Sequence, residues 1–97
     1  MKLLSIKPST NSDKKQMATF SNGRTIHFGA KGLKDFTIYS KGDKDVAKQK
    51  KDAYIARHKV NENWNEPTTA GALSRWILWN LPTKEASIAD FKKRFNL

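Results

Sequence analysis

The chain has 97 residues, and its 19 Lys and Arg side chains against nine Asp and Glu give a formal net charge of +10. This length accommodates a single small domain, residues 1–97, and excludes a large enzyme architecture. Five Phe, three Trp and two Tyr exclude a purely disordered basic tail, and the lack of cysteine excludes a disulfide framework.

The chain opens with a pattern typical of a strand. Leu4 and Ile6 alternate with Ser5 and Lys7, which predicts a strand with one buried face. The polar residues that follow, from Pro8 to Lys15, predict a loop. No stretch approaches the ~20 apolar residues of a membrane-spanning helix. We therefore expect a soluble, intracellular protein with no membrane partner.

Two further alternating runs, residues 16–20 and 24–28, flank the sequence Ser21-Asn22-Gly23. Asn-Gly between such runs favours a hairpin with a type I′ turn, which needs positive φ at both central residues. In this hairpin we expect Ile26 and Phe28 to share one face, with Phe20 and Ala18 opposite them on the neighbouring strand.

The segment Phe36-Thr37-Ile38-Tyr39 has the composition of an extended piece, and we expect either an edge strand or an ordered loop there. The rest of the chain is typical of helices. Asp43 caps a predicted helix that runs from about Lys44 to Lys59.

A second predicted helix runs from Ala70 to about Trp79, with Thr68 or Thr69 as its cap. Ser87 and Asp90 form a capping box, which predicts the start of a third helix. Its apolar stripe consists of Ile88, Phe91 and Phe95.

Strands therefore come first and helices after. This order predicts an α+β fold, with a small N-terminal antiparallel hairpin or three-stranded sheet followed by three short helices. Residues 1–40 hold the strands and loops, and residues 43–97 hold the helices.

The lysines of the first predicted helix gather on one face of a helical wheel. Such a face can bind phosphates without reading base sequence, or it can simply keep a small domain soluble. Because the net charge is +10, we keep the hypothesis that this face binds a polyanion. The basic end of the third predicted helix is included in the candidate binding surface. The candidate residues are Lys44, Lys48, Lys51, Lys59, Lys92, Lys93 and Arg94.

Two cations, Lys50 and Arg57, break the helical pattern because they fall in the middle of the apolar face. Cations at these positions are explained if their long side chains carry the charged ends past the apolar face to solvent. They are also explained if an acid such as Asp35, Glu62 or Glu66 pairs with Arg57. The alternative is that this face of the helix is wet or contacts a partner.

The second predicted helix is apolar on nearly every side, since Trp79 projects away from the stripe that contains Leu73 and Ile77. Its tryptophans either complete the core, or Trp79 anchors a protein partner or stacks on bases. Trp76, Trp79 and Tyr54 are the candidate interface residues.

The sequence gives little support for a catalytic site or a metal centre. His27 and His58 are the only histidines, and two histidines without cysteine argue against a zinc site. Helix capping explains Asp43 better than a magnesium site with Asp45. We expect no catalytic residues, no metal and no cofactor, and therefore no enzyme.

Several stretches resemble the small basic proteins encoded by large DNA viruses of algae and protists, such as phycodnaviruses and mimiviruses. The resemblance covers most of residues 16–96 and lies in Ile26–Gly29, Tyr39-Ser40, Lys50-Lys51, Tyr54, Ala56–His58, Leu73–Asn80 and Ala86–Phe95. It implies a virus-encoded protein and a virion component. It supplies no catalytic or binding residues.

Together these patterns predict a non-enzymatic structural protein of a virion, either a minor capsid protein or a capsid-associated one. Its basic face would meet packaged DNA or an acidic capsid surface. The alternative is a sequence-nonspecific nucleic-acid-binding protein that acts in the cytoplasm or nucleus of the infected cell. Residues 1–40 have seven basic against two acidic side chains, residues 41–60 seven against three, and residues 61–97 five against four. The chain thus has a basic half and an aromatic, nearly balanced half.

Overall fold

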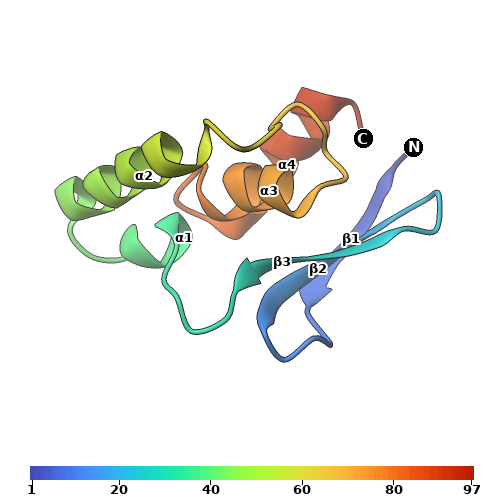
Figure 1. The fold of residues 1–97 in the computed structure, drawn as a ribbon, viewed down its shortest axis with the longest axis horizontal. Coiled ribbons are helices and arrows are strands. Elements are labelled where there is room, and N and C mark those ends of the chain that lie inside the picture. The colour runs from blue at the N-terminus through green and yellow to red at the C-terminus, as the bar shows by residue number, and fades with distance from the viewer.

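The computed structural model describes all 97 residues, and a three-stranded antiparallel sheet comes first in the chain. Its strands are β1 (Leu3–Pro8), β2 (Lys14–Phe20) and β3 (Thr25–Ala30), which lie in that order (Figure 1). Ala18 pairs with Ile26, and both lie on the face that packs against the helices, as do Phe20 and Phe28. This confirms the face expected for the hairpin.

The alternation expected for β1 is wrong at Leu4. Leu3 pairs with Phe20 and Ser5 with Thr19, so that the register shifts between these two pairs. A bulge of this kind turns the next side chain to the other face of the sheet. Leu3 is therefore buried in the core and the partly buried Ile6 packs against it, whereas Leu4 is exposed.

The hairpin turn differs from the expected type I′. Gly23 has a φ of 87°, but Asn22 does not have a positive φ. The Gly23 N–H donates to the Phe20 carbonyl at 3.0 Å, and the Phe20 N–H donates to the Arg24 carbonyl at 2.9 Å. This arrangement is a turn closed by a left-handed glycine, in which only the glycine needs positive φ.

Residues 36–39 form neither an edge strand nor a loop but the short helix α1 (Phe36–Tyr39). The Asp35 carboxylate caps it by accepting hydrogen bonds from the Thr37 and Ile38 amides. This cap outweighs the β-propensity of Thr37 and Ile38, because it satisfies amides that a helix start leaves without partners.

The long helix α2 (Lys44–His58) confirms the predicted lysine-rich helix and its Asp43 cap. Asp43 accepts from the amides of Asp45 and Val46 at 2.8 and 3.2 Å. Figure 1 shows α2 lying at the side of the molecule, away from the sheet.

The second predicted helix is present from Ala70 to Leu78 with Thr69 as its cap, but only its first turn is α-helical. α3 (Ala70–Leu73) continues into the π-helical segment η1 (Ser74–Leu78). The Trp79 amide closes η1 by donating to the Ser74 carbonyl five residues earlier at 3.0 Å. A π-helical turn is wider than an α-helical one, so a 100° helical wheel misplaces the residues that follow Ser74.

The last helix, α4 (Lys84–Phe95), begins three residues before the predicted capping box. Thr83 caps it by accepting from the Ala86 amide. Ser87 is fully buried, and its hydroxyl instead accepts from the Leu81 amide at 3.0 Å, which fixes the preceding loop. The predicted stripe of Ile88, Phe91 and Phe95 does pack on the core.

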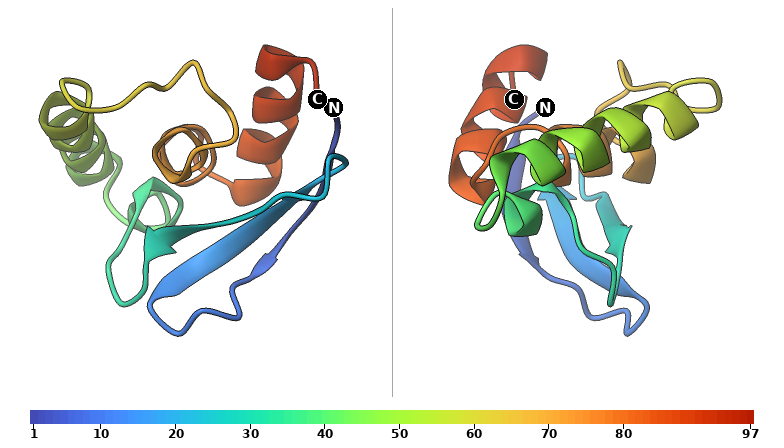
Figure 2. Two further views of the ribbon diagram at one scale, coloured as in Figure 1. Left: turned by 45° about the vertical axis from the view of Figure 1, so that its right-hand side comes forward. Right: turned by 90° about the vertical axis from the view of Figure 1, so that its left-hand side faces the viewer.

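α3, η1 and α4 cover one face of the sheet, and α3 lies between α2 and α4 (Figure 2). This arrangement confirms the predicted α+β fold. The core lies between the sheet and the layer of α3, η1 and α4, and α2 contributes none of its nine buried residues. They are Leu3, Ala18, Phe20, Phe28, Leu73, Ile77, Leu78, Phe91 and Leu97. No helix combines the length and the apolar composition that crossing a bilayer requires.

Candidate functional site

A groove of about 490 Å³ separates α2 from the open end of the β2–β3 hairpin, where β2 begins and β3 ends. We call it the α2 groove. Four basic side chains line it and form no ion pair with any acid: Lys14, Lys34, Lys50 and Arg57. Each of these residues is exposed. Two acids also line the groove, but Asp35 pairs with Lys15, and the Glu62 carboxylate lies 3.8 Å from the His58 ring. The α2 groove is therefore a concave surface with an excess of positive charge.

Lys50 and Arg57, the two cations that break the pattern of α2, both face this groove. The pairing of Arg57 with an acid, one of the explanations left open by the sequence, is absent. Asp35 binds Lys15, and the Glu66 carboxylate accepts from the Thr68 hydroxyl and amide. Because α2 lies away from the sheet, this face of the helix is open to solvent, and cations there remain hydrated.

Tyr39 forms part of the wall of the α2 groove between two of its lysines. The Lys34 and Lys50 ammonium nitrogens each lie 5.9 Å from the centre of the Tyr39 ring. A cation near an aromatic ring is attracted to its face, but this attraction does not neutralise the charge. The two ammonium groups therefore remain available to an anion.

One wall of the α2 groove contains a largely buried ion pair. The Lys15 ammonium donates to the Asp35 carboxylate at 2.8 Å, and the Asp35 side chain is only 4% exposed. The other Asp35 oxygen accepts from the Thr37 amide at 3.0 Å. With its carboxylate oxygens bonded, Asp35 has a structural part in joining β2 to α1.

A second groove, of about 650 Å³, lies between α1 and the start of α4, and we call it the α1–α4 groove. It too is rich in lysine, with Lys31, Lys41 and Lys84 against the acids Asp35 and Glu85. Two buried polar atoms of residues that line it have no hydrogen-bond partner, namely Gln16 Oε1 and Ser40 Oγ. Such orphaned groups are rare inside proteins and need a specific explanation.

The lysines predicted on α2 do not form one uniform surface. Lys44 and Lys59 are exposed and form no ion pair, whereas the Lys48 ammonium donates to Asp52 at 2.8 Å, which raises the pKa of Lys48. Lys51 turns inward, where its ammonium donates to the Asn80 carbonyl at 2.7 Å and lies 4.8 Å from the centre of the Phe36 ring. Burial lowers the pKa of Lys51, and the nearby Arg75 charge lowers it further.

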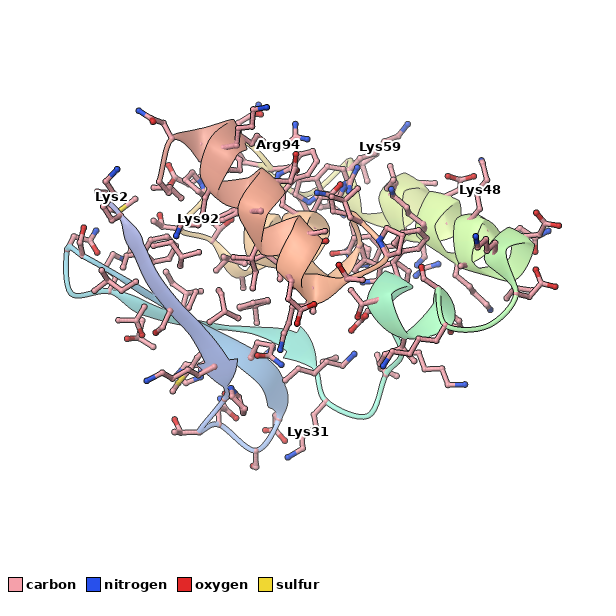
Figure 3. The ribbon with its side chains drawn as sticks, turned by 180° about the vertical axis from the view of Figure 1, so that it is seen from behind. Lys2, Lys31, Lys48, Lys59, Lys92 and Arg94 are labelled. Carbon is pink, nitrogen blue, oxygen red and sulfur yellow. The ribbon has the colours of Figure 1, made fainter.

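The predicted basic residues of α4 also divide. Lys92 and Lys93 are exposed, but the Arg94 guanidinium lies 3.8 Å from the centre of the Trp76 ring and donates to Asp90 at 3.3 Å. α3 lies between α2 and α4, and Figure 3 shows the labelled cations spread around the molecule. The structure therefore does not bring the predicted lysines of α2 and α4 together into one patch.

The three predicted interface residues, Trp76, Trp79 and Tyr54, contact side chains of their own chain. The Trp79 ring stacks on Tyr54 from α2, with the ring centres 4.5 Å apart and the planes 6° apart. The Trp76 ring lies against Arg75 and Arg94, and its indole N–H donates to the Trp64 carbonyl at 2.8 Å. These contacts attach α2 and the segment around Trp64 to η1.

The two histidines lie in separate places. The His27 ring forms a 2.6 Å hydrogen bond with the Ser9 hydroxyl, and the His58 ring stacks on Tyr54. No three side chains of His, Cys, Asp or Glu come close enough together to hold a metal ion. Burial raises the pKa of Tyr54 to about 12, and the Glu62 charge contributes in the same direction.

Sequence reasoning missed most of the residues that line the two grooves. Lys14, Lys34 and Lys41 lie in or beside loops, where no periodicity shows which way a side chain points. The only available signal was the position of Lys50 and Arg57 on the apolar face of a helix, for which a wet face was one of the open explanations.

Residues 4–58, from β1 to the end of α2, match the family of unknown function DUF5754, and the chain belongs to this family. No curated protein matches the chain, and no solved structure matches its fold.

Proposed function

We propose that this protein is a non-enzymatic structural protein that binds nucleic-acid phosphates without reading base sequence, and that it acts as a minor capsid or capsid-associated component of a virion. The observation that carries the binding proposal is the α2 groove, where Lys14, Lys34, Lys50 and Arg57 line one concavity and form no ion pairs. The resemblance to proteins of large DNA viruses supports the virion setting.

The physical basis of the proposed binding is the release of counterions. Each lysine or arginine that neutralises a phosphate releases a condensed cation from the nucleic acid, and this gain depends on salt. Three of the four free cations of the α2 groove are lysines. A lysine ammonium is a point charge without the planar fork by which arginine recognises a guanine edge. The groove is thus suited to phosphates rather than to base edges.

A salt titration tests the binding proposal. We expect the fluorescence anisotropy of a labelled oligonucleotide to report binding that weakens steeply as salt rises. Lys50→Ala with Arg57→Ala should weaken this binding. The matched control replaces Lys92 and Lys93, which are equally exposed but lie on α4. A flat salt response, or no binding at low salt, contradicts the proposal.

The virion setting is tested separately. Purified virions are disrupted stepwise, and an antibody follows the protein among the shell, the released DNA and the soluble fraction. Recovery with the shell or with the packaged DNA supports a virion component. Absence from virions, together with presence in infected cells, favours the alternative of a nucleic-acid-binding protein that acts free in the cell.

A further inference from the structure

Resting on the proposed function, we infer that the nucleic acid which this protein prefers is single-stranded, and that one strand crosses both the α2 groove and the α1–α4 groove. The first reason is that the two grooves are neighbours. Lys15, Asp35 and Leu78 line both of them, so the buried Lys15–Asp35 ion pair forms a shared wall.

Basic residues that form no ion pair lie on both sides of this shared wall. Lys34 lies in the α2 groove and Lys31 in the α1–α4 groove, and both belong to the short segment between β3 and α1. On either side of this segment the path extends to Lys50 on α2 and to Lys84 on α4. A flexible chain of phosphates can therefore follow cations from one groove into the other.

The concave shape favours a single strand over a duplex. Each groove has the volume of a small-molecule pocket, about 490 and 650 Å³. A duplex is a stiff rod with a persistence length of about 150 base pairs, and it cannot bend into two small concavities. A single strand can fold into them. The duplex would instead meet the convex outer side of α2, where Lys44 and Lys59 are exposed.

Two unpartnered polar atoms allow the α1–α4 groove to form hydrogen bonds with a base as well as with phosphates. Gln16 Oε1 and Ser40 Oγ are buried without a hydrogen-bond partner and belong to residues that line the α1–α4 groove. The terminal torsion of glutamine is broad, so a small rotation turns its amide toward a ligand. In a single strand the base edges are unpaired, and their N–H groups supply the donor that Gln16 lacks, whereas a duplex keeps these donors paired.

Tyr54 offers no stacking platform for a base in this binding mode. The Tyr54 ring is stacked on both His58 and Trp79, so neither of its faces is free for a base. Phosphate contacts and the Gln16 and Ser40 hydrogen bonds therefore hold the strand. This distinguishes the two grooves from the aromatic platforms on which many single-strand-binding proteins stack bases.

The test compares labelled oligothymidylates of about 3 to 16 nucleotides, and a duplex as long as the longest of them, by fluorescence anisotropy over a range of salt. We expect the longer single strands to bind at least tenfold more tightly than the duplex. Replacing Lys50 and Arg57, or Lys41 and Lys84, by alanine should weaken that binding at least tenfold, and each pair should reduce the salt slope by about 1.4. The shortest oligonucleotide should respond to only one of the two pairs.

Two further variants sharpen the result. Lys44→Ala with Lys59→Ala is the matched control on the outer side of α2, and it should change single-strand affinity less than twofold. Gln16→Met removes an orphaned polar atom, so it should raise the melting temperature of the free protein while it weakens the longer single strands at least threefold.

The outcomes separate this inference from the proposed function. If the duplex binds as tightly as the single strand, or if only the Lys44 and Lys59 variant weakens binding, phosphate binding stands and the two-groove path is wrong. If the variants of one groove alone matter at every length, the crossing of both grooves is wrong. If neither nucleic acid binds at low salt, both proposals fail.

Discussion

Tyr54 and Trp79 stack face to face, with ring centres 4.5 Å apart and planes 6° apart, and this stack attaches α2 to the rest of the molecule. α2 contributes no residue to the main core. Its attachment depends on this stack, on the hydrogen bond from Lys51 to Asn80 and on its packing against α1. Because α2 forms one wall of the α2 groove, the stack also sets the shape of that groove.

Trp79→Ala should destabilise the protein by about 2–3 kcal/mol, since it removes a large, mostly buried ring. A double-mutant cycle with Tyr54→Ala should give a coupling energy of about 0.5–1.5 kcal/mol for the stack. Urea unfolding followed by circular dichroism measures these values. Additive effects of the two substitutions would show that the stacked geometry contributes no energy of its own.

Stability should fall between about pH 10 and pH 12 because of Tyr54. Burial raises the pKa of Tyr54 to about 12, whereas an exposed tyrosine in the unfolded chain titrates near its ordinary value of 10. In that window the unfolded chain loses the proton and the folded protein keeps it, so unfolding becomes more favourable as pH rises. In a Tyr39→Phe variant, ultraviolet absorbance reports the Tyr54 phenolate alone, and its midpoint should lie near 12. A midpoint near 10 would contradict the burial of this hydroxyl.

Lys51 should behave as a structural residue and not as a phosphate ligand. Lys51→Ala leaves the Asn80 carbonyl without its donor and should cost about 1–2 kcal/mol of unfolding free energy. Lys44→Ala, at an exposed position of the same helix, should change stability by less than about 0.5 kcal/mol. Chemical denaturation of the two variants measures both effects. Equal stabilities would show that the hydrogen bond from Lys51 to the Asn80 carbonyl does not stabilise the fold.

Arg94 should stabilise the fold through Trp76. Its guanidinium lies 3.8 Å from the centre of the Trp76 ring, a contact worth about 0.5–1 kcal/mol near a surface. Arg94→Lys keeps the charge but loses the planar group, so it should cost nearly as much as Arg94→Ala. Lys93→Ala is the neighbouring control. Thermal melts compare the three, and full stability in Arg94→Lys would assign the effect to charge alone.

Asp35→Ala should be among the most damaging single changes in the chain. It leaves the largely buried Lys15 side chain without its partner and removes the cap of α1, at a combined cost of about 3–5 kcal/mol. Asp52→Ala breaks an ion pair of the same length, 2.8 Å, but an exposed one, and should cost less than about 1 kcal/mol. Similar losses in the two variants would show that burial of the Lys15–Asp35 pair is unimportant.

Local patterns predicted much of the fold. Asp43 and Thr69 mark the starts of two helices, and the apolar residues that flank Asn22-Gly23 place the hairpin face correctly. The failures came where a local signal competed with a stronger one. The Asp35 cap stabilises a helix in a segment that has β-propensity. Thr83 caps α4, so this helix begins before Ser87.

The candidate site was less accessible to sequence reasoning. A helical wheel assumes regular α-helix, and the π-helical η1 turns Trp79 back onto Tyr54 instead of outward. The same wheel placed Lys51 among solvated lysines, although the loop after η1 offers it the Asn80 carbonyl. Both errors concern contacts between segments that lie 25 or more residues apart, which no local pattern encodes.

The core described above joins the two ends of the chain, and this has a consequence for folding during synthesis. The apolar face of the sheet, with Ala18, Phe20 and Phe28, is covered by Leu73, Ile77 and Phe91, which leave the ribosome 45 to 73 residues later. Until then the sheet has nothing to pack against, and a three-stranded sheet with an uncovered apolar face is prone to associate with other chains. The closing of these distant contacts, rather than the formation of any one helix, should therefore limit the folding rate of this protein.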